Sequence, residues 1–313
     1  MSISVATRID SFVHPALFYA DQEEYLAGTL PFIRAGLAAD EPVMVAVPGD
    51  SLEHIRAALG ADAGRVQLHD MSVAGRNPGR IIPGVLLAFA AAHAGKRVRI
   101  IGEPIWAGRT ATEYPACAQH EALINAAFAG RQATILCPYH TGHLDRRWLD
   151  DARRTHPVVQ MGSAVRVSPH YADPIAVAAG FNLPLEDPPA QAITVTIDLQ
   201  ALSVIRRVVA AEATAAGLSP DRVSDLTLAV SELAANTIKH TAAGGTLAIW
   251  TDDTRLICQL TDTGHIANPL AGRLPVPPQQ PGSRGLLLVN QLCDLVRIHT
   301  VPGATTIRLH MHR

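Results

Sequence analysis

Little net charge, few cysteines and no long apolar run set the first limits on this 313-residue chain. A formal net charge of −2 gives no reason to expect direct nucleic-acid binding or a polybasic membrane patch. The four cysteines are scattered and form no CxxC pair, so a disulfide framework is not expected. No apolar run reaches the ~20 residues that cross a bilayer, and the first residues do not read as a signal peptide. We therefore expect a soluble, cytoplasmic protein with reduced cysteines.

The glycine loops that usually bind phosphate are also missing. Neither GxxxxGKS/T nor GxGxxG occurs, so phosphate binding by those loops is not indicated. The composition is 48% hydrophobic and 17% charged, which is globular, and the chain is long enough for two cores. Prolines and acidic residues interrupt the patterning at FNLPLEDPPAQA. We predict a first domain over residues 1–180, a linker over 181–192 and a second domain over 193–313.

In the first domain, short β-branched runs alternate with longer Ala/Leu-rich segments. The predicted strands are PVMVAVP, RVQLHD, RVRIIGEP and ATILCPY. The predicted helices cover residues 21–38, 51–59, 80–94 and 114–129. This alternation predicts βαβ units, and hence an α/β domain with a mainly parallel sheet.

Polar and aromatic residues leave the predicted strands where ligands of such sheets usually bind. They are Asp50, Asp70, Glu103, Trp106, Tyr139 and His140. We interpret them as a candidate pocket for a small sensory ligand. The alternative is that they are solvated loop residues, which are expected at loop ends in any case.

A metal site is a separate hypothesis for the end of the fourth strand. Cys137, His140 and His143 offer sulfur and imidazole ligands at short spacing. A structural zinc site needs a fourth ligand, and none is evident nearby. The alternative, a buried cysteine with two loop histidines, therefore stays open.

The second domain begins with two helices and continues with strands, an order that predicts an α+β fold. In its second helix, Val223, Leu226, Val230 and Leu233 recur at helical spacing and form an apolar face. Polar residues lie on the neighbouring face: Asn236 follows Glu232 by four residues, and Lys239 and His240 follow Asn236 by three and four. Taken alone, this polar row also suits a solvent-exposed helix.

Two further segments follow in order. A predicted strand runs into Asp262-Thr263-Gly264, and a proline-rich stretch then leads to GSRGLLLV, where glycines open an apolar helix. Backbone N–H groups at such a helix start form a ready site for an anion.

Residues Leu199–Arg313 resemble the GHKL ATPases of the Bergerat fold and, within them, the bacterial anti-sigma factor serine kinases. ELAANTIKH is similar to their N box, DTG to the first glycine box and GSRGLLLV to the second. The resemblance implies an ATP site with Mg²⁺ on Asn236. It assigns Glu232 to the attacking water or hydroxyl, Asp262 to the adenine amino group and Gly264 to close approach of the ring. The other implied nucleotide contacts are Lys239, His240, Gly282, Ser283, Arg284, Gly285 and Leu286.

This second domain departs from the family pattern in two ways. Ile266 stands where the first glycine box usually continues with glycine, and the lid is short. Both departures predict weak nucleotide binding and put phosphoryl transfer in doubt.

The first domain resembles the MEDS sensory module, through HPALFY, FIRAGLAADEPVMVAVP, IGEPIW, HEALINAAF and CPYHTG. A MEDS module before this ATPase is the arrangement of the RsbA family of bacterial anti-sigma regulators. The resemblance implies a regulator that binds a sigma factor and phosphorylates a serine or threonine of a STAS-type antagonist, and it leaves room for a homodimer.

Two alternatives to this function remain. The protein could hold ATP as a binding module without transferring phosphate. It could also be a sensor histidine kinase that uses His120 in QHEAL, although this histidine is not in paired dimerisation helices directly before the ATPase domain.

Overall fold

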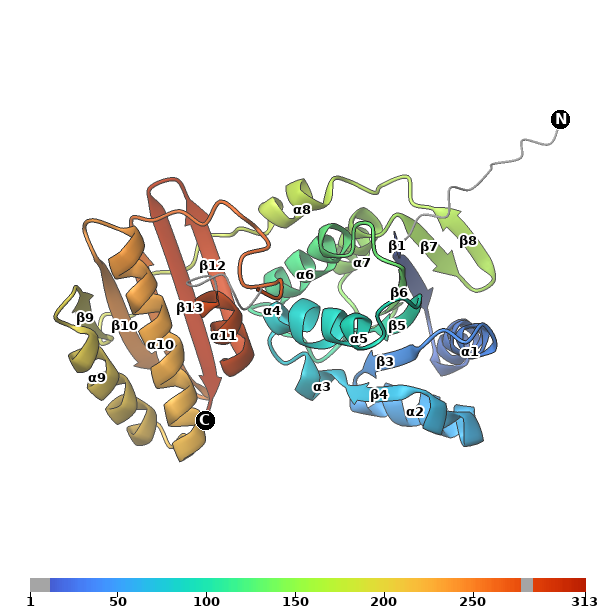
Figure 1. The fold of residues 1–313 in the computed structure, drawn as a ribbon, viewed down its shortest axis with the longest axis horizontal. Helices are drawn as coiled ribbons and strands as arrows, with labels where there is room; N and C mark the ends of the chain where they lie inside the picture. Colours follow the sequence, from blue (N-terminus) through green and yellow to red (C-terminus); the bar gives the residue numbers. More distant parts are fainter. Residues whose placement is uncertain (1–11, 277–283) are drawn as a thin grey trace. The chain divides into compact units, whose positions relative to one another are not determined.

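The computed structural model describes residues 12–276 and 284–313. These residues form two compact units (Figure 1). The first comprises the described residues up to Gly75 together with Val85–Val177, and the second comprises Arg76–Gly84 with Ala178–Arg313. Within the described ranges, the structure contains no helix long and apolar enough to cross a membrane.

The first unit contains one extended sheet in the order β4-β3-β5-β6-β2-β7-β8, with β1 also beside β6. Its strands are β1 (Phe12–Val13), β2 (Pro15–Tyr19), β3 (Val43–Val47), β4 (Gln67–Asp70), β5 (Val98–Gly102), β6 (Ala133–His140), β7 (Val158–Met161) and β8 (Ala164–Val167). Every pair is parallel except β7 with β8. The predicted α/β class with a mainly parallel sheet is confirmed.

Helices cover both faces of this sheet (Figure 1). They are α1 (Gln22–Ala38), α2 (Gly49–Leu59), α3 (Met71–Ala74), α5 (Leu87–Ala92), α6 (Tyr114–Ala127) and α7 (Arg146–Thr155). The apolar sequence VMVAV of β3 is buried at every residue, as a strand covered on both faces requires. α1 begins where the Asp21 carboxylate accepts a hydrogen bond from the Glu24 N–H (2.9 Å), which caps the helix.

The helix expected over residues 80–94 is present but irregular, and one strand was not predicted. The helix expected over 80–94 consists of α4 (Pro78–Ile81), a π-helical turn (Ile82–Leu86) and α5. Pro83 lies in the π turn and has no N–H to donate, so a regular helix cannot continue through it. PALFY, quoted above only as a family motif, forms the buried strand β2.

The second unit is an antiparallel sheet in the order β12-β13-β11-β10-β9, covered on one face by three helices (Figure 1). Its strands are β9 (Ile193–Ile197), β10 (Gly245–Thr251), β11 (Arg255–Asp262), β12 (Leu295–Val301) and β13 (Ala304–His312). The covering helices are α9 (Leu202–Ala215), α10 (Pro220–His240) and α11 (Gly285–Leu292). The predicted α+β class is confirmed.

Local signals explain how this unit folds. Ser219 caps α10 by accepting a hydrogen bond from the Arg222 N–H (3.4 Å), and Pro220 occupies the first turn. β12 and β13 meet across a turn in which Gly303 has a φ of 86°, a conformation that favours glycine. Residues 181–192 contain no helix or strand. Asn182 nevertheless holds this stretch to β12, because it donates to Thr300 O (2.7 Å) and accepts from Thr300 N (3.0 Å).

Candidate functional site

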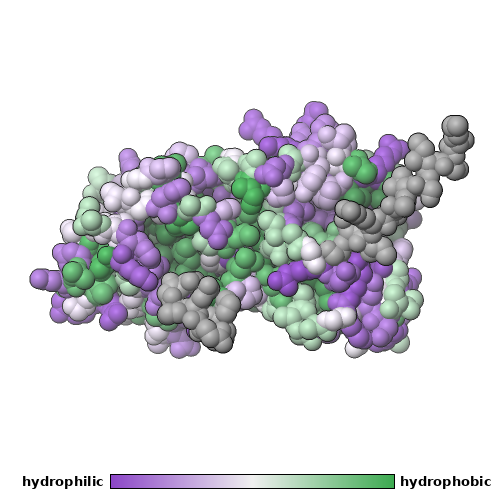
Figure 2. Space-filling view, turned by 45° about the horizontal axis from the view of Figure 1, so that its top comes forward, coloured by the Kyte–Doolittle hydropathy of each residue, from purple (hydrophilic) through white to green (hydrophobic). Residues whose placement is uncertain are grey.

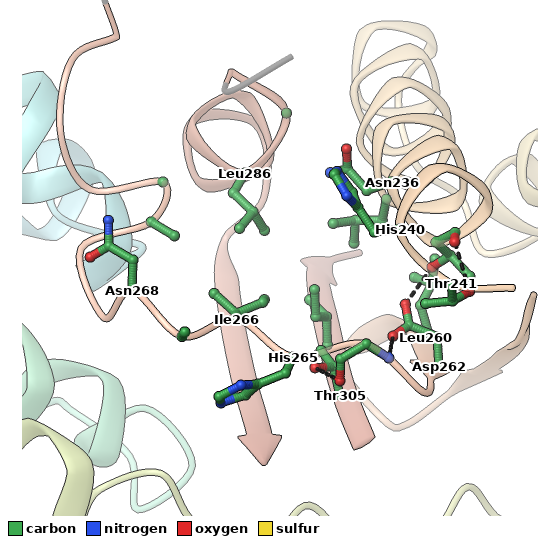
Figure 3. Close-up of a pocket in the computed structure, with 18 of the residues that line it drawn as sticks. Asn236, His240, Thr241, Leu260, Asp262, His265, Ile266, Asn268, Leu286 and Thr305 are labelled. Atoms are coloured by element: carbon green, nitrogen blue, oxygen red, sulfur yellow. Dashed lines mark hydrogen bonds between the residues drawn. The ribbon is translucent and has the colours of Figure 1, made fainter. Parts of the chain in front are cut away.

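A cavity of about 580 Å³ lies in the second unit between α10, the end of β11 and the start of α11 (Figure 3). The loop that follows β11 closes another side, with Gly264, Ile266 and Asn268 among the lining residues. The cavity is large enough for a small organic ligand. Its walls combine apolar residues with a few polar groups, as ligand sites usually do.

Helix α10 presents one face to this cavity. Leu233, Asn236, Thr237 and His240 line it, because residues three and four apart lie on the same side of a helix. Figure 3 shows the side chains of Asn236 and His240 next to each other at one wall. Lys239 is exposed and does not line the cavity.

Asp262 is held rigidly at the end of β11. Its Oδ2 accepts a hydrogen bond from Thr237 Oγ1 (2.6 Å), and its Oδ1 accepts one from Gly264 N (2.8 Å). Each carboxylate oxygen keeps a further lone pair for a ligand donor. A Cβ at Gly264 would lie 2.9 Å from Asp262 Oδ1, so a side chain there would disturb this arrangement.

A second threonine supports the same corner from β13. Thr305 is paired with Asp262 in the sheet register, and its hydroxyl donates to Gly264 O (3.0 Å). It also contacts Thr300 Oγ1 (2.7 Å), which accepts a hydrogen bond from Ile266 N (2.9 Å). Thr237 and Thr305 are site residues that the sequence analysis missed. Thr237 directly follows Asn236, so the sequence spacing could have identified it. Thr305 can be identified only from the pairing of β13 with β11.

At the start of α11, helix N–H groups that can bind an anion lie next to side-chain oxygens that can bind a cation. A Cβ on Gly285 would lie 3.0 Å from Asn236 Nδ2 and 3.2 Å from Glu232 Oε2. The N-terminal N–H groups of a helix attract phosphate, and an amide oxygen is a hard ligand that suits Mg²⁺. Arg284 lies at the N-cap of this helix and is exposed, whereas Gly282 and Ser283 lie outside the described residues.

Ile266 and Leu286 form apolar walls of the cavity. Their side chains point toward each other in Figure 3, and both pack against the core of the unit. Ile266 therefore has a structural reason to be there: it extends the core to the rim of the cavity. The residues present fit a nucleotide, with an apolar slot for a base and a polar end for phosphates.

The candidate sensory residues of the first unit do not form one group. Glu103 is buried and accepts hydrogen bonds from Tyr19 OH (3.1 Å) and Tyr25 OH (3.4 Å). Burial raises the pKa of Glu103 to about 8, against the opposing effect of both hydroxyls. His140 lies near these rings, 5.0 Å from that of Tyr19 between centroids, whereas Tyr139 points to the other face of β6 because successive strand residues alternate.

The remaining members of that set are closer to solvent. Asp50 is exposed in the first turn of α2, and Asp70 caps α3 by accepting from Ser72 N (2.8 Å). The Trp106 ring lies under the Arg109 guanidinium, 3.9 Å from its Cζ. Asp70 therefore acts as a helix cap, and Trp106 packs against Arg109.

The geometry disfavours the two other predicted sites, the metal site after β6 and the phosphoacceptor His120. Cys137 and His140 are three residues apart in β6 and so face opposite sides of the sheet, while His140 stacks on His143 at 3.7 Å between ring centroids. These three residues therefore do not converge on one ion. His120 is 1% exposed within α6, and this burial argues against a phosphoacceptor role.

Comparisons with known proteins bear on both units. Residues 13–157 match the family model MEDS, the methanogen/methylotroph DcmR sensory domain, and residues 195–311 match the histidine kinase-like ATPase domain. No curated protein matches the chain. A solved structure that is similar to it contains the RsbU and RsbW domains of Rv1364c from Mycobacterium tuberculosis, with 21% identity and a TM-score of 0.31. The match covers 40% of this chain and 34% of that one, so this chain spans about a third of its length. The predicted pairing of a MEDS domain with a GHKL-like ATPase domain is confirmed.

Proposed function

We propose that this protein is a cytoplasmic anti-sigma regulator whose second unit binds Mg-ATP and phosphorylates a protein partner under control of the MEDS domain. The observation that carries the proposal is the meeting of Asp262, Asn236, Glu232 and the start of α11 around one cavity. A carboxylate for a base, an amide for a cation and helix N–H groups for phosphates are the parts that phosphoryl transfer requires.

Each of these groups has a role that its position allows. Asp262 accepts a hydrogen bond from the adenine amino group, while Gly264 lets the backbone lie close to the ring. Asn236 holds Mg²⁺, and the first turn of α11 binds the phosphates. Mg-ATP supplies the phosphoryl group and neutralises charge at the phosphates when it is bound.

Glu232 is placed to receive a partner's hydroxyl. It lies beside Gly285 at the cavity rim, and it also lines an open groove between α9 and α10. Leu228, which is 44% exposed, lines the same groove. A partner segment in this groove brings its serine or threonine to Glu232, which would take the hydroxyl proton as that oxygen bonds to the γ-phosphorus of ATP and the bond from this phosphorus to ADP breaks.

The partners are a sigma factor and a STAS-type antagonist, of which the antagonist carries the hydroxyl. In the space-filling view, hydrophilic and hydrophobic residues are interspersed over the face that is drawn (Figure 2). We look for the antagonist at the α9–α10 groove because Glu232 lines it.

Radiolabelled ATP tests the proposed reaction. The full chain is incubated with labelled ATP and with partners captured from the native cell, and the products are treated with acid. We expect an acid-stable label on a partner, as a serine or threonine ester gives. Label on the protein itself that is acid-labile, and lost in His120→Gln, would identify a histidine kinase instead.

The second candidate function is a binding module that holds ATP without transferring phosphate. One observation favours it: Glu232 borders the cavity but is not among the residues that line it. In this case ATP binds and a partner is captured, but no label reaches the partner.

A further inference from the structure

Four side chains of three chemical types meet in the interior of the first unit. This four-residue cluster consists of His14, Glu121, Cys137 and His156, each at most 1% exposed. One potential ligand atom from each lies within 4.8 Å of the others. His14 lies between β1 and β2, Glu121 in α6, Cys137 in β6, and His156 directly after α7, so the cluster exists only in the folded unit.

Three of the six distances between ligand atoms in the cluster are close to those of a tetrahedral metal site. His14 Nε2 lies 3.4 Å from Cys137 Sγ and 3.4 Å from the Oε2 of Glu121. His156 Nε2 lies 3.2 Å from the same Oε2. Ligands bound to zinc at ~2.0–2.3 Å in a tetrahedron are separated from one another by roughly 3.3–3.8 Å.

The Nδ1 atoms of both imidazoles are within hydrogen-bonding distance of groups outside the cluster. His156 Nδ1 lies 2.8 Å from Ala152 O, a carbonyl that can only accept, so this nitrogen carries the proton. His14 Nδ1 lies 3.2 Å from Asn125 Oδ1. The Asn125 amide is oriented by its NH₂ group, which donates to Thr155 O (2.8 Å), so its oxygen faces His14. When these rings are neutral, both Nε2 atoms therefore direct lone pairs into the cluster.

Imidazole lone pairs that face a carboxylate repel it unless a proton or a metal ion lies between them. Among the residues that the structure describes, Glu121 Oε1 and Oε2 and His156 Nε2 have no hydrogen-bond partner. A divalent cation bound by a thiolate and a carboxylate is electrically neutral, which is the state that a fully buried site favours.

We propose that the four-residue cluster is a closed tetrahedral site for a divalent transition-metal ion with the ligand preference of zinc. Two imidazoles, one thiolate and one carboxylate fill all four positions, and no position is left for a substrate. The ion joins β6, α6, the end of α7 and the residue before β2. Its effect is therefore to stabilise the first unit.

Metal analysis of the full chain tests this site. The protein is purified without chelators through a tag that does not bind metal, incubated with Zn²⁺, passed through a desalting column and analysed by mass spectrometry. We expect about one zinc ion per chain. Replacement of zinc by Co²⁺ should give the thiolate charge-transfer band and the intense visible bands of a tetrahedral cobalt site, a readout that needs no variant.

Matched variants locate the ion. Cys137→Ser should weaken zinc binding at least about tenfold and abolish the cobalt–thiolate band, whereas Cys117→Ser, another buried cysteine, should retain both. Asn125→Ala leaves all four ligands in place and should weaken binding by about 10- to 100-fold in chelator competition, because it removes the hydrogen bond that orients His14. His143→Gln should bind like the wild type.

Two results would overturn the proposal. One is wild-type protein that keeps less than about a tenth of an ion per chain after incubation with Zn²⁺ and gives no cobalt–thiolate band. The other is His143→Gln that loses zinc as fully as Cys137→Ser, which would move the ion to the loop after β6.

Discussion

The cavity of the second unit and the four-residue cluster of the first unit both contain a carboxylate and imidazole, but the cavity is open and the cluster is buried. In the cavity, Asp262 keeps lone pairs that face open space, and its own position is fixed by Thr237 and Gly264. In the cluster, Glu121 is buried among the other potential ligands and near the Tyr139 hydroxyl. An open polar site suits a ligand that exchanges during each reaction, whereas a closed one suits an ion that stays.

The surroundings of a carboxylate decide its task. Glu232, on the cavity rim, is accessible from the α9–α10 groove and can exchange a proton with an incoming hydroxyl. Glu121 has no such access, and its charge requires permanent compensation. Substitutions at the two kinds of site should therefore affect different properties: turnover and ligand binding in one, stability in the other.

The largest expected effect is on phosphoryl transfer. Glu232→Gln should lower the rate of transfer to the partner by about 10²- to 10⁴-fold, because the amide cannot accept the hydroxyl proton. Single-turnover labelling measures the rate, and calorimetry checks that ATP still binds. Glu212→Gln on α9 serves as the control and should label the partner at the wild-type rate. A Glu232→Gln protein that transfers phosphate normally would remove this residue from the mechanism.

The next effect concerns ligand-dependent stability. Mg-ATP at about 100 times its dissociation constant should stabilise the second unit by roughly 2.7 kcal/mol. Asn236→Ala should lose most of this gain, since it removes the Mg²⁺ ligand beside the start of α11. Thermal unfolding with and without Mg-ATP measures the difference. If ATP alone stabilises wild type and variant equally, and Mg²⁺ adds nothing to either, Asn236 does not hold the cation.

The first unit contains another buried carboxyl group, that of Glu103. Glu103 has two tyrosine hydroxyls beside it instead of imidazoles, and burial raises its pKa to about 8. The folded protein therefore keeps this proton above pH 4.5, where the unfolded chain has begun to lose it. Because the folded state binds more protons in this window, its stability falls as pH rises from about 4.5 to about 8.

Glu103→Gln should remove that dependence. The slope contributed by one proton is at most about 1.4 kcal/mol per pH unit. Urea unfolding of the first unit can be followed by the fluorescence of Trp106 and Trp148 in a Trp250→Phe background. Glu53→Gln, an exposed control on α2, should keep the wild-type slope. An unchanged slope in Glu103→Gln would show that other groups titrate in this window.

Site residues that are close together in the sequence could be predicted, whereas those that meet only in the folded chain could not. Glu232 and Asn236 lie within one helix, and Asp262 with Gly264 lie at one strand end, so local spacing was enough to find them. Thr305 depends on the pairing of β13 with β11.

The four-residue cluster is the extreme case of this limit. Its ligands extend from residue 14 to residue 156 and meet only through the packing of α6 and α7 on the sheet. Cys137 was recognised as a potential ligand, but the alternation of β6 sends His140 to the other face. In the same way, residue types alone did not reveal that Glu103 is buried between two tyrosines.

The smallest expected effect is that of Lys239→Ala on ATP binding. This variant tests whether residues outside the cavity lining contribute to the nucleotide site. Lys239 lies in the last turn of α10, between Asn236 and His240 in the sequence, but it is exposed and does not line the cavity. A helix advances by about 100° per residue, which places Lys239 on the flank of the face that Leu233, Thr237 and His240 share. Lys239→Ala should therefore change the ATP dissociation constant by less than about twofold, the size expected of a surface substitution. Calorimetry of both proteins at the same ionic strength measures it, and a loss of about tenfold or more would mean that the ammonium reaches the phosphates.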